Sequence, residues 1–278
     1  MNARPVSNAV CAKVFVALLL TGACFSSHSE PLPKSADVLA RIVARTSAVT
    51  EATNACSYVY EKRSLVEELN SHGEAVRSTE KIYKVVLVQG WPFSRLIKVQ
   101  GKPLSEAESR REDQREQEFR NKITGHNLDD MAKKKENWIT PELLSRYHFK
   151  VLSKELCRGR QAILLEFTPK KNNPQNDIKD RIFDRLAGRI WVDEEEAEIA
   201  KLDVHLTEEF SLGWLGMLGS LKDCRLMGER GRMPDGTWVN AKHTLLVVGR
   251  KLLGTMRYRT TEESNDFRQE PPSISSGL

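Results

Sequence analysis

Hydrophobic and polar residues alternate along much of this chain, and in a few places the alternation gives way to helical spacing. Val38, Leu39, Ile42 and Val43 recur on one helical face. They follow Ser35, a residue type that favours helix N-caps. We therefore expect a helix from residue 35 that buries this face against a large apolar surface.

Most of the remaining pattern predicts antiparallel β-structure. Apolar residues at even positions from Ala200 to Leu206 alternate with Lys201, Asp203 and His205, which is typical of a half-buried strand. Turn residues such as Pro234-Asp235-Gly236 separate similar segments. The expected strands are 56–68, 79–89, 93–99, 149–157, 161–168, 188–193, 200–206, 222–233, 237–250 and 256–261.

The run Val85 to Val88 is apolar on both faces of its predicted strand. Such a strand is covered on both sides, for example by the core on one face and a helix on the other. Trp91-Pro92 predicts a break before the next strand.

Residues 105–136 predict a charged helix. Ser105 and Glu108 have the spacing of a capping box. Acidic and basic residues recur four positions apart, and apolar residues are nearly missing before Ile123. A solvated outer helix is favoured over a docking arm for an acidic partner or for anionic headgroups. Thr140 and Pro141 predict the start of a second, short helix.

The first 29 residues have the order of an export signal. Arg4 and Lys13 give a positive start, Val14 to Leu20 form an apolar core, and small residues follow. The apolar core is shorter than the ~20 residues of a membrane-spanning helix. We expect a periplasmic protein, with peripheral or lipid-anchored membrane association as an open alternative.

Two cleavage sites fit the sequence. Leu20 to Cys24 resembles a bacterial lipobox, in which Cys24 is acylated and residues 1–23 are removed. The rival cut follows Ser29 and discards Cys24. Residues 30–268 then form one β domain with a charged helical insert at about 105–139, and residues 269–278 read as a disordered tail.

Composition and charge are those of an ordinary globular domain. The signal holds two positive charges and no acid, so the formal net charge of +5 falls to +3 in the mature chain. That excess does not indicate a nucleic-acid partner. Cys56, Cys157 and Cys224 remain, and an oxidising compartment permits one disulfide among three pairings.

The search for catalytic motifs predicts no enzyme, no metal site and no cofactor. The chain has no Gly-x-Ser-x-Gly, no His-Glu-x-x-His and no Cys-x-x-Cys. The acidic turn Glu194-Glu195-Glu196 is expected to be solvated. A catalytic set assembled only by folding stays open, with His148, His205 and His243 as the histidines to check.

The segment from Ser211 to Ser220 is uncharged and carries a glycine at every third position. Connections are usually polar and exposed. The segment is either a buried plug or an apolar lip of a cavity, in which Trp214, Leu215, Met217 and Leu218 would touch an acyl chain.

Three segments carry a family resemblance: Arg95–Ser105, Gly188–Asp193 before the acidic turn, and Asp235–Val239. With the preceding pattern, most of residues 35–268 resembles the outer-membrane lipoprotein-sorting superfamily (LolA/LolB type). The resemblance implies a mainly β (α+β) fold: an unclosed, strongly curled antiparallel β-barrel with helices over an apolar concave face. It also implies periplasmic handling of lipids or lipoprotein acyl chains. The charged insert makes this chain longer than the typical carrier.

The leading hypothesis is therefore a non-enzymatic periplasmic carrier or chaperone of acyl chains. The alternatives are an envelope-stress sensor or regulatory lipoprotein that binds a protein partner through the charged helix, and, more remotely, a hydrolase. The candidate cavity-lining residues are Val86, Val88, Leu202, Val204 and Leu206.

Overall fold

A computed structural model describes residues 31–52, 58–125, 139–175, 177–211, 219–251 and 254–270. The chain divides into two compact units, Met1–Pro31 and Leu32–Leu278, and every helix and strand described lies in the second. Cys24, Cys56 and the residues from Trp214 to Leu218 lie outside the described residues.

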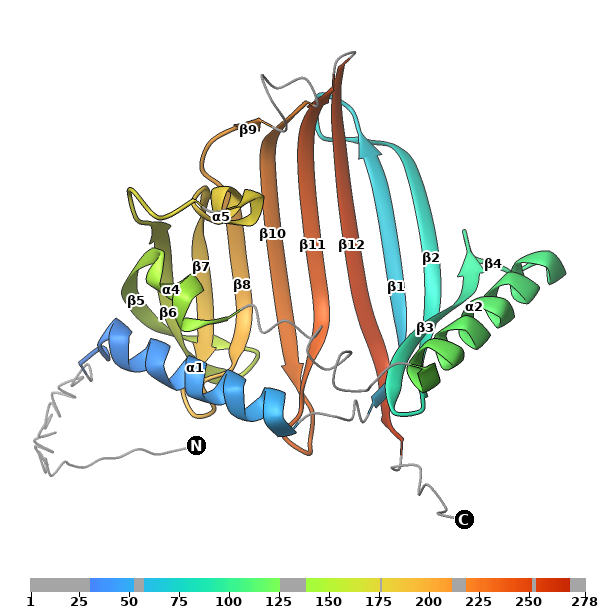
Figure 1. Ribbon diagram of the computed structural model, residues 1–278, viewed down its shortest axis with the longest axis horizontal. Coiled ribbons are helices and arrows are strands. Elements are labelled where there is room, and N and C mark those ends of the chain that lie inside the picture. Colours follow the sequence, from blue (N-terminus) through green and yellow to red (C-terminus); the bar gives the residue numbers. More distant parts are fainter. Residues whose placement is uncertain are drawn as a thin grey trace, which may run out of the picture. The chain divides into compact units, whose positions relative to one another are not determined.

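A single antiparallel sheet of 12 strands organises the second unit (Figure 1). Its order is β4-β3-β2-β1-β12-β11-β10-β8-β7-β6-β5, and β9 pairs with β10. The two ends of this order, β4 and β5, do not pair with each other, so the curled sheet is not closed. The fold class implied by the sequence and its resemblance is confirmed.

The elements up to Cys157 supply both edges of the sheet. These elements are α1 (Ser35–Ala52), β1 (Tyr58–Leu69), β2 (Ala75–Val88), β3 (Trp91–Val99), β4 (Lys102–Pro103), α2 (Glu106–Gly125), α4 (Pro141–Ser145) and β5 (Tyr147–Cys157).

The second half supplies the middle of the sheet. Its elements are β6 (Arg160–Pro169), α5 (Ile178–Phe183), β7 (Leu186–Asp193), β8 (Ile199–Leu206), β9 (Phe210–Ser211), β10 (Ser220–Arg232), β11 (Trp238–Lys251) and β12 (Gly254–Gln269).

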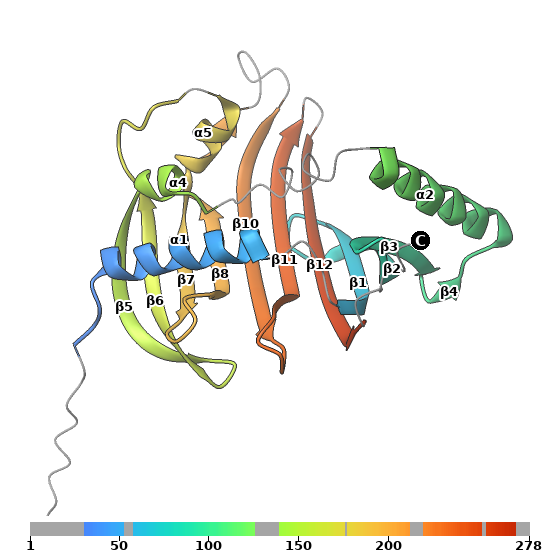
Figure 2. The ribbon, with the colours of Figure 1, turned by 60° about the horizontal axis from the view of Figure 1, so that its bottom comes forward.

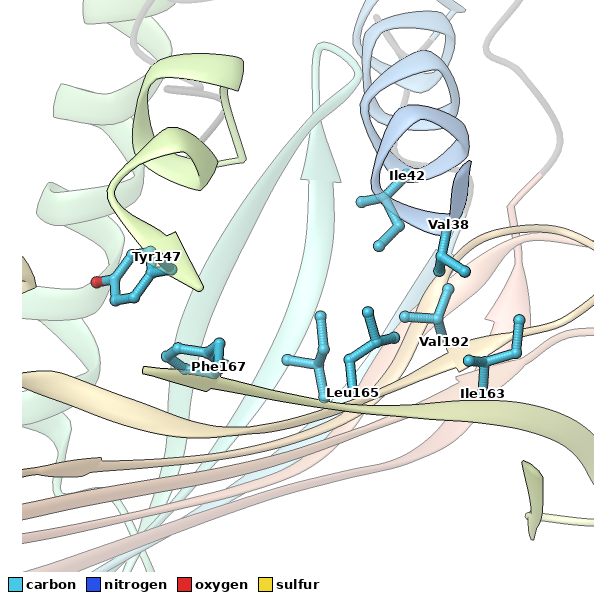
Figure 3. Packing of buried hydrophobic residues seen from close by; sticks show 8 residues of the cluster. Val38, Ile42, Tyr147, Ile163, Leu165, Phe167 and Val192 are labelled. Atoms are coloured by element: carbon cyan, nitrogen blue, oxygen red, sulfur yellow. The ribbon is translucent and has the colours of Figure 1, made fainter. Parts of the chain in front are cut away.

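Helix α1 crosses the sheet over β5 to β8 (Figure 2). Val38 and Ile42 point from the helix onto Ile163 and Leu165 of β6 and Val192 of β7 (Figure 3). Each of these five side chains is at most 2% exposed. The predicted apolar face of the N-terminal helix is therefore part of the main core, as its spacing indicated.

Helix α2 packs on β3 at the other end of the sheet. Its Phe119 and Ile123 meet Val88 and Phe93, and Phe119 and Phe93 have ring centroids 5.2 Å apart. Arg95 pairs with Asp113 and with Glu116 (Nη1–Oε2 2.7 Å), so the ion pairs of α2 also face the sheet. Most residues of α2 are exposed, as expected of a solvated outer helix, but the sequence did not predict that Phe119 and Ile123 attach it to β3.

Local signals for helix starts are confirmed. The Ser105 backbone N–H and hydroxyl both donate to the Glu108 carboxylate at 2.8 and 2.7 Å, the predicted capping box. Thr140 caps α4 by accepting from the Leu143 N–H at 3.1 Å, with Pro141 at the first helical position.

Two boundaries differ from the sequence prediction. The break before β3 falls at Gln89-Gly90, with φ of 51° and 80°, and Trp91-Pro92 begins the strand. Two consecutive positive φ angles make the tight hairpin turn that long antiparallel strands favour. The last strand runs from Gly254 to Gln269, much longer than 256–261, because β1 and β11 pair with it on both sides.

Candidate functional site

The strand register assigns side chains across the sheet to two faces. Leu202 packs against the α1 cluster, which defines its side as the inner face. Opposed residues in neighbouring strands project to the same side, so the row from Leu202 continues through Gly228, His243, Glu262, Ser64 and Lys81. The next row is Val204, Leu226, Leu245, Thr260, Val66 and Thr79.

The outer face of the central strands carries ion pairs across the strands. Arg259 binds Glu67 through two hydrogen bonds of 2.7 and 3.1 Å. Arg225 binds Asp203 in the same way at 2.9 and 2.7 Å. These pairs give the outer face a polar, solvated surface.

The inner face of the same strands is apolar and half-exposed. Leu226, Leu245 and Val247 are partly buried, and Val66 and Tyr258 are 39% and 38% exposed. From Leu245 to Gly249 this stripe covers five residues of β11, or about 14 Å. We call it the apolar stripe. Its residues meet solvent, while the same face of β6 and β7 is sealed by α1.

A hollow of about 290 Å³ lies over β8, β10 and β11. Ile199, Leu202, Leu226, Gly228 and His243 line it from the inner face, and its remaining lining residues include Lys201, Glu229, Arg230, Asn240 and Lys242. A smaller hollow of about 140 Å³ shares Ile199 and Arg230 with it and continues to Ile42 of α1. Together they form an apolar depression at the edge of the helix.

A polar cluster adjoins this depression on β1, β12, β11 and β2. The Glu262 carboxylate lies 3.4 Å from the Lys62 ammonium and 3.4 Å from the His243 Nε2. The Lys62 ammonium also lies 5.1 Å from the centroid of the Tyr83 ring. Burial, and then the Glu262 charge, raise the pKa of Tyr83. Lys62, Glu262, His243 and Tyr83 are called the polar cluster below.

Ion pairs hold α1 beside the depression. The Glu198 carboxylate, whose side chain is 10% exposed, accepts from Arg45 at 2.9 Å and from Arg230 at 2.5 Å. Arg41 of α1 donates to the backbone carbonyls of Glu194 and Glu195 at 2.6 and 3.1 Å. The helix is therefore attached to both the β7–β8 turn and β10.

The acidic turn after β7 is solvated in part, as predicted: the Glu195 side chain is 79% exposed, whereas that of Glu196 is 21% exposed and paired. Glu196 accepts from the Trp238 indole at 2.7 Å and from Arg232 at 2.5 Å. Burial alone would raise the pKa of Glu196, but these two donors lower it. The partners of Glu196 lie in a hairpin about 40 residues later in the chain. Only the order of the strands in the sheet brings this hairpin next to the turn.

The predicted lining residues fall into separate places. Leu202 lines the hollow, Val204 packs beside it on the α1 cluster, and Leu206 lies further along the same face at 8% exposure. Val86 and Val88 project to the opposite face, under α2. Val85 and Val88 are each 1% exposed on opposite faces, so the prediction of a strand covered on both sides is confirmed.

The sequence did not single out Lys62, Ser64 or Glu262, and the polar cluster appears only through the register of β1 and β12. The one available signal was alternation in β1, where Lys62, Ser64 and Val66 share a face. That signal does not say which strand lies beside β1.

The polar cluster contains His243, one of the three histidines named as candidates for a hydrolytic relay. His243 meets a carboxylate, and Ser64 is buried nearby at 8% exposure. However, Glu262 lies between them in the row, and strands about 4.8 Å apart place His243 two strands from Ser64. A nucleophilic relay needs the histidine in the middle. Among the described residues, no group of three or more His, Cys, Asp or Glu side chains is arranged to hold a metal ion.

Cys157 and Cys224 are both free thiols, and burial raises the pKa of each. Of the three pairings that the sequence permits, the one between Cys157 and Cys224 is therefore not formed. No helix in the described part of the chain combines the length and apolar character needed to cross a membrane.

No protein-family model and no curated protein sequence matches this chain. Solved structures do show likenesses. A LolA superfamily protein from Nitrosomonas europaea is 11% identical, with a TM-score of 0.28 and coverage of 86% of this chain and 97% of that chain. A DUF1329 family protein from Desulfovibrio piger is 12% identical, with a TM-score of 0.32 and coverage of 86% and 95%.

The MucA/MucB complex from Pseudomonas aeruginosa contains a chain that is 10% identical, with a TM-score of 0.23 and coverage of 84% of this chain and 99% of that chain. The matches thus include the superfamily that the sequence resembles. Ligands and partners of this chain have to be inferred from its own residues.

Proposed function

We propose that this protein is a non-enzymatic carrier or chaperone that binds acyl chains of lipids or lipoproteins on the inner face of its sheet, in the periplasm. The observation that carries the proposal is the apolar stripe. Leu226, Leu245, Val247, Val66 and Tyr258 lie side by side and half-exposed on the face that α1 seals only over β5 to β8. Contiguous exposed apolar surface of this kind marks a binding site.

The energetics suit a reversible ligand. Burying an acyl chain yields ~0.8 kcal/mol per methylene, and association costs several kcal/mol. A long chain is therefore held with a modest surplus and passes to any partner that buries it better. The predicted export signal, with or without acylation at Cys24, would deliver the protein to a compartment where such chains need shielding from water.

The alternative function, a regulatory lipoprotein that binds an envelope protein through its charged helix, meets a constraint. Arg95 forms ion pairs with Asp113 and Glu116, and the Leu96 N–H donates a hydrogen bond to Glu112 at 3.0 Å. Three acidic residues of α2 thus serve the contact with β3. A partner would have to use the remaining outer surface of the helix, where Arg110, Arg111 and Lys122 are exposed.

Fluorescent acyl-probe binding, followed by displacement with fatty acid, tests the carrier proposal. Leu245→Glu places a charge in the apolar stripe and should abolish probe binding. Leu246→Glu is the matched control, because Leu246 is the next residue on β11, is also half-buried and projects to the outer face. Equal binding of the probe by both variants would overturn the proposal. So would wild-type protein that binds no probe and, after gentle purification, shows no lipid in native mass spectra.

A further inference from the structure

The polar cluster closes one end of the apolar stripe with charges of both signs. Lys62 and Glu262 are each 23% exposed, so a ligand can reach both without displacing the core. Their pair is not bidentate and is 3.4 Å long, unlike the tight Arg259–Glu67 pair on the outer face. An ion pair of this kind contributes little to stability.

A second cation lies beside Lys62 on the same face. Lys81 on β2 is opposed to Ser64 and is exposed. Lys62 is opposed to Tyr83, two residues away, so the two ammonium groups lie diagonally across β1 and β2. Glu262 lies on the other side of Lys62, on β12. Across three neighbouring strands, the order is Lys81 on β2, Lys62 on β1 and Glu262 on β12.

We infer that this cluster is the headgroup end of the acyl-binding face, and that it selects a lipid whose headgroup carries both a phosphate and an amine. The inference rests on the proposed function. Lys62 and Lys81 match the phosphate, and Glu262 matches the amine. A purely anionic headgroup that binds Lys62 would draw it from Glu262 and supply no amine to replace it, and an uncharged headgroup would leave the Lys62–Glu262 pair as it is. The apolar stripe then begins one row away, at Leu245 and Thr260.

Binding is measured with three single-chain lipids of one acyl length: a lysophosphatidylethanolamine, a lysophosphatidylglycerol and an uncharged monoacylglycerol. The wild-type protein should prefer them in that order. Glu262→Gln should remove the preference for ethanolamine over glycerol. Lys62→Met should weaken both phospholipids by about tenfold or more relative to monoacylglycerol, because a charge-assisted contact is lost.

The matched control removes the ion pair on the outer face of the same two strands. Glu67→Gln with Arg259→Met leaves the inner face intact and should not change the order of the three lipids. Lys81→Met removes the other cation, which is exposed, and leaves the Lys62–Glu262 pair intact. It should weaken both phospholipids relative to monoacylglycerol and keep the preference for ethanolamine over glycerol, and it tests the inference even if Lys62→Met does not fold.

Equal affinity of the wild-type protein for all three lipids, or an equal loss for all three in Lys62→Met, would overturn the headgroup inference while leaving acyl binding in place. Binding of none of the three lipids, with Leu245→Glu indistinguishable from the wild type, would instead overturn the proposed function.

Discussion

Arg160 and Asp193 form a two-pronged ion pair, Nε–Oδ2 2.6 Å and Nη2–Oδ1 3.0 Å, in which the Asp193 side chain is 1% exposed. The same carboxylate accepts the backbone N–H groups of Glu195 and Glu196 at 3.2 and 2.9 Å. This one carboxylate therefore shapes the turn that attaches α1.

Removing the cation from this pair should destabilise the protein strongly. Arg160→Met leaves the Asp193 charge buried without its partner, and such a loss costs about 3–5 kcal/mol. Arg189→Met is the control, because the Arg189–Glu166 pair is 3.6 Å long and exposed, and its loss should cost about 1 kcal/mol or less. Urea unfolding measures both. Equal losses in the two variants would show that the Asp193 pair is not special.

The same pair predicts a pH dependence. Burial alone would raise the pKa of Asp193, but the Arg160 hydrogen bonds and the two backbone donors lower it. The folded-state pKa thus lies below the unfolded value of about 3.9. The stability that this group contributes is complete above that value and is lost as pH falls through the folded pKa.

In Arg160→Met, the hydrogen bonds from Arg160 that lower the Asp193 pKa are gone, while the burial that raises it remains. The difference in unfolding free energy between wild type and Arg160→Met should therefore be largest above about pH 5 and shrink below about pH 3. Urea unfolding at a series of pH values checks this. A difference that stays constant with pH contradicts the assigned cause.

Gly188 should not tolerate a side chain. A Cβ built there would overlap the Asp203 carbonyl oxygen and lie 2.9 Å from the Val204 Cα, both backbone atoms. Gly188→Ala must separate β7 from β8, and we expect a loss of about 2–4 kcal/mol. At Gly231 the nearest atom is the end of the Arg158 side chain at 3.5 Å, so Gly231→Ala should be nearly neutral. Thermal unfolding compares them, and a similar melting temperature for both variants would refute the backbone clash.

Docking of α2 should depend on its one buried apolar residue. Ile123 is 4% exposed against Val88 and Phe93. Ile123→Ala should cost about 2–4 kcal/mol and open the helix locally, since the remaining contacts of α2 with β3 are the partly buried Phe119 and ion pairs at the surface. Limited proteolysis should then cut within α2 before the sheet unfolds.

The exposed neighbour Lys122 provides the control for α2, because Lys122→Ala removes no core contact. Its cleavage rate should match the wild type. Uniform cleavage across the chain in Ile123→Ala, in place of early cleavage in α2, would mean that the helix and the sheet unfold together.

The sequence alone predicted several local elements that the structure contains. They are the helix with Val38 and Ile42 on its apolar face, the capping box of Ser105 and Glu108, and the alternating strand from Ala200 to Leu206. Each depends on residues within one or two turns of helix or a few strand positions. The number of predicted antiparallel strands, together with the family resemblance, also led to the prediction of a curled, unclosed sheet.

The site was decided by tertiary structure. Alternation shows that Lys62, Ser64 and Val66 share a face, but the register of β1 against β12 is what places Glu262 beside Lys62. A similar pattern put Val86 and Val88 among the candidate lining residues, yet α2 covers them on the opposite face. The sequence determines which residues share a face of a strand, because side chains alternate between the two faces. Strand order and register instead follow from contacts between distant segments, such as Glu67 and Arg259, which are 192 residues apart.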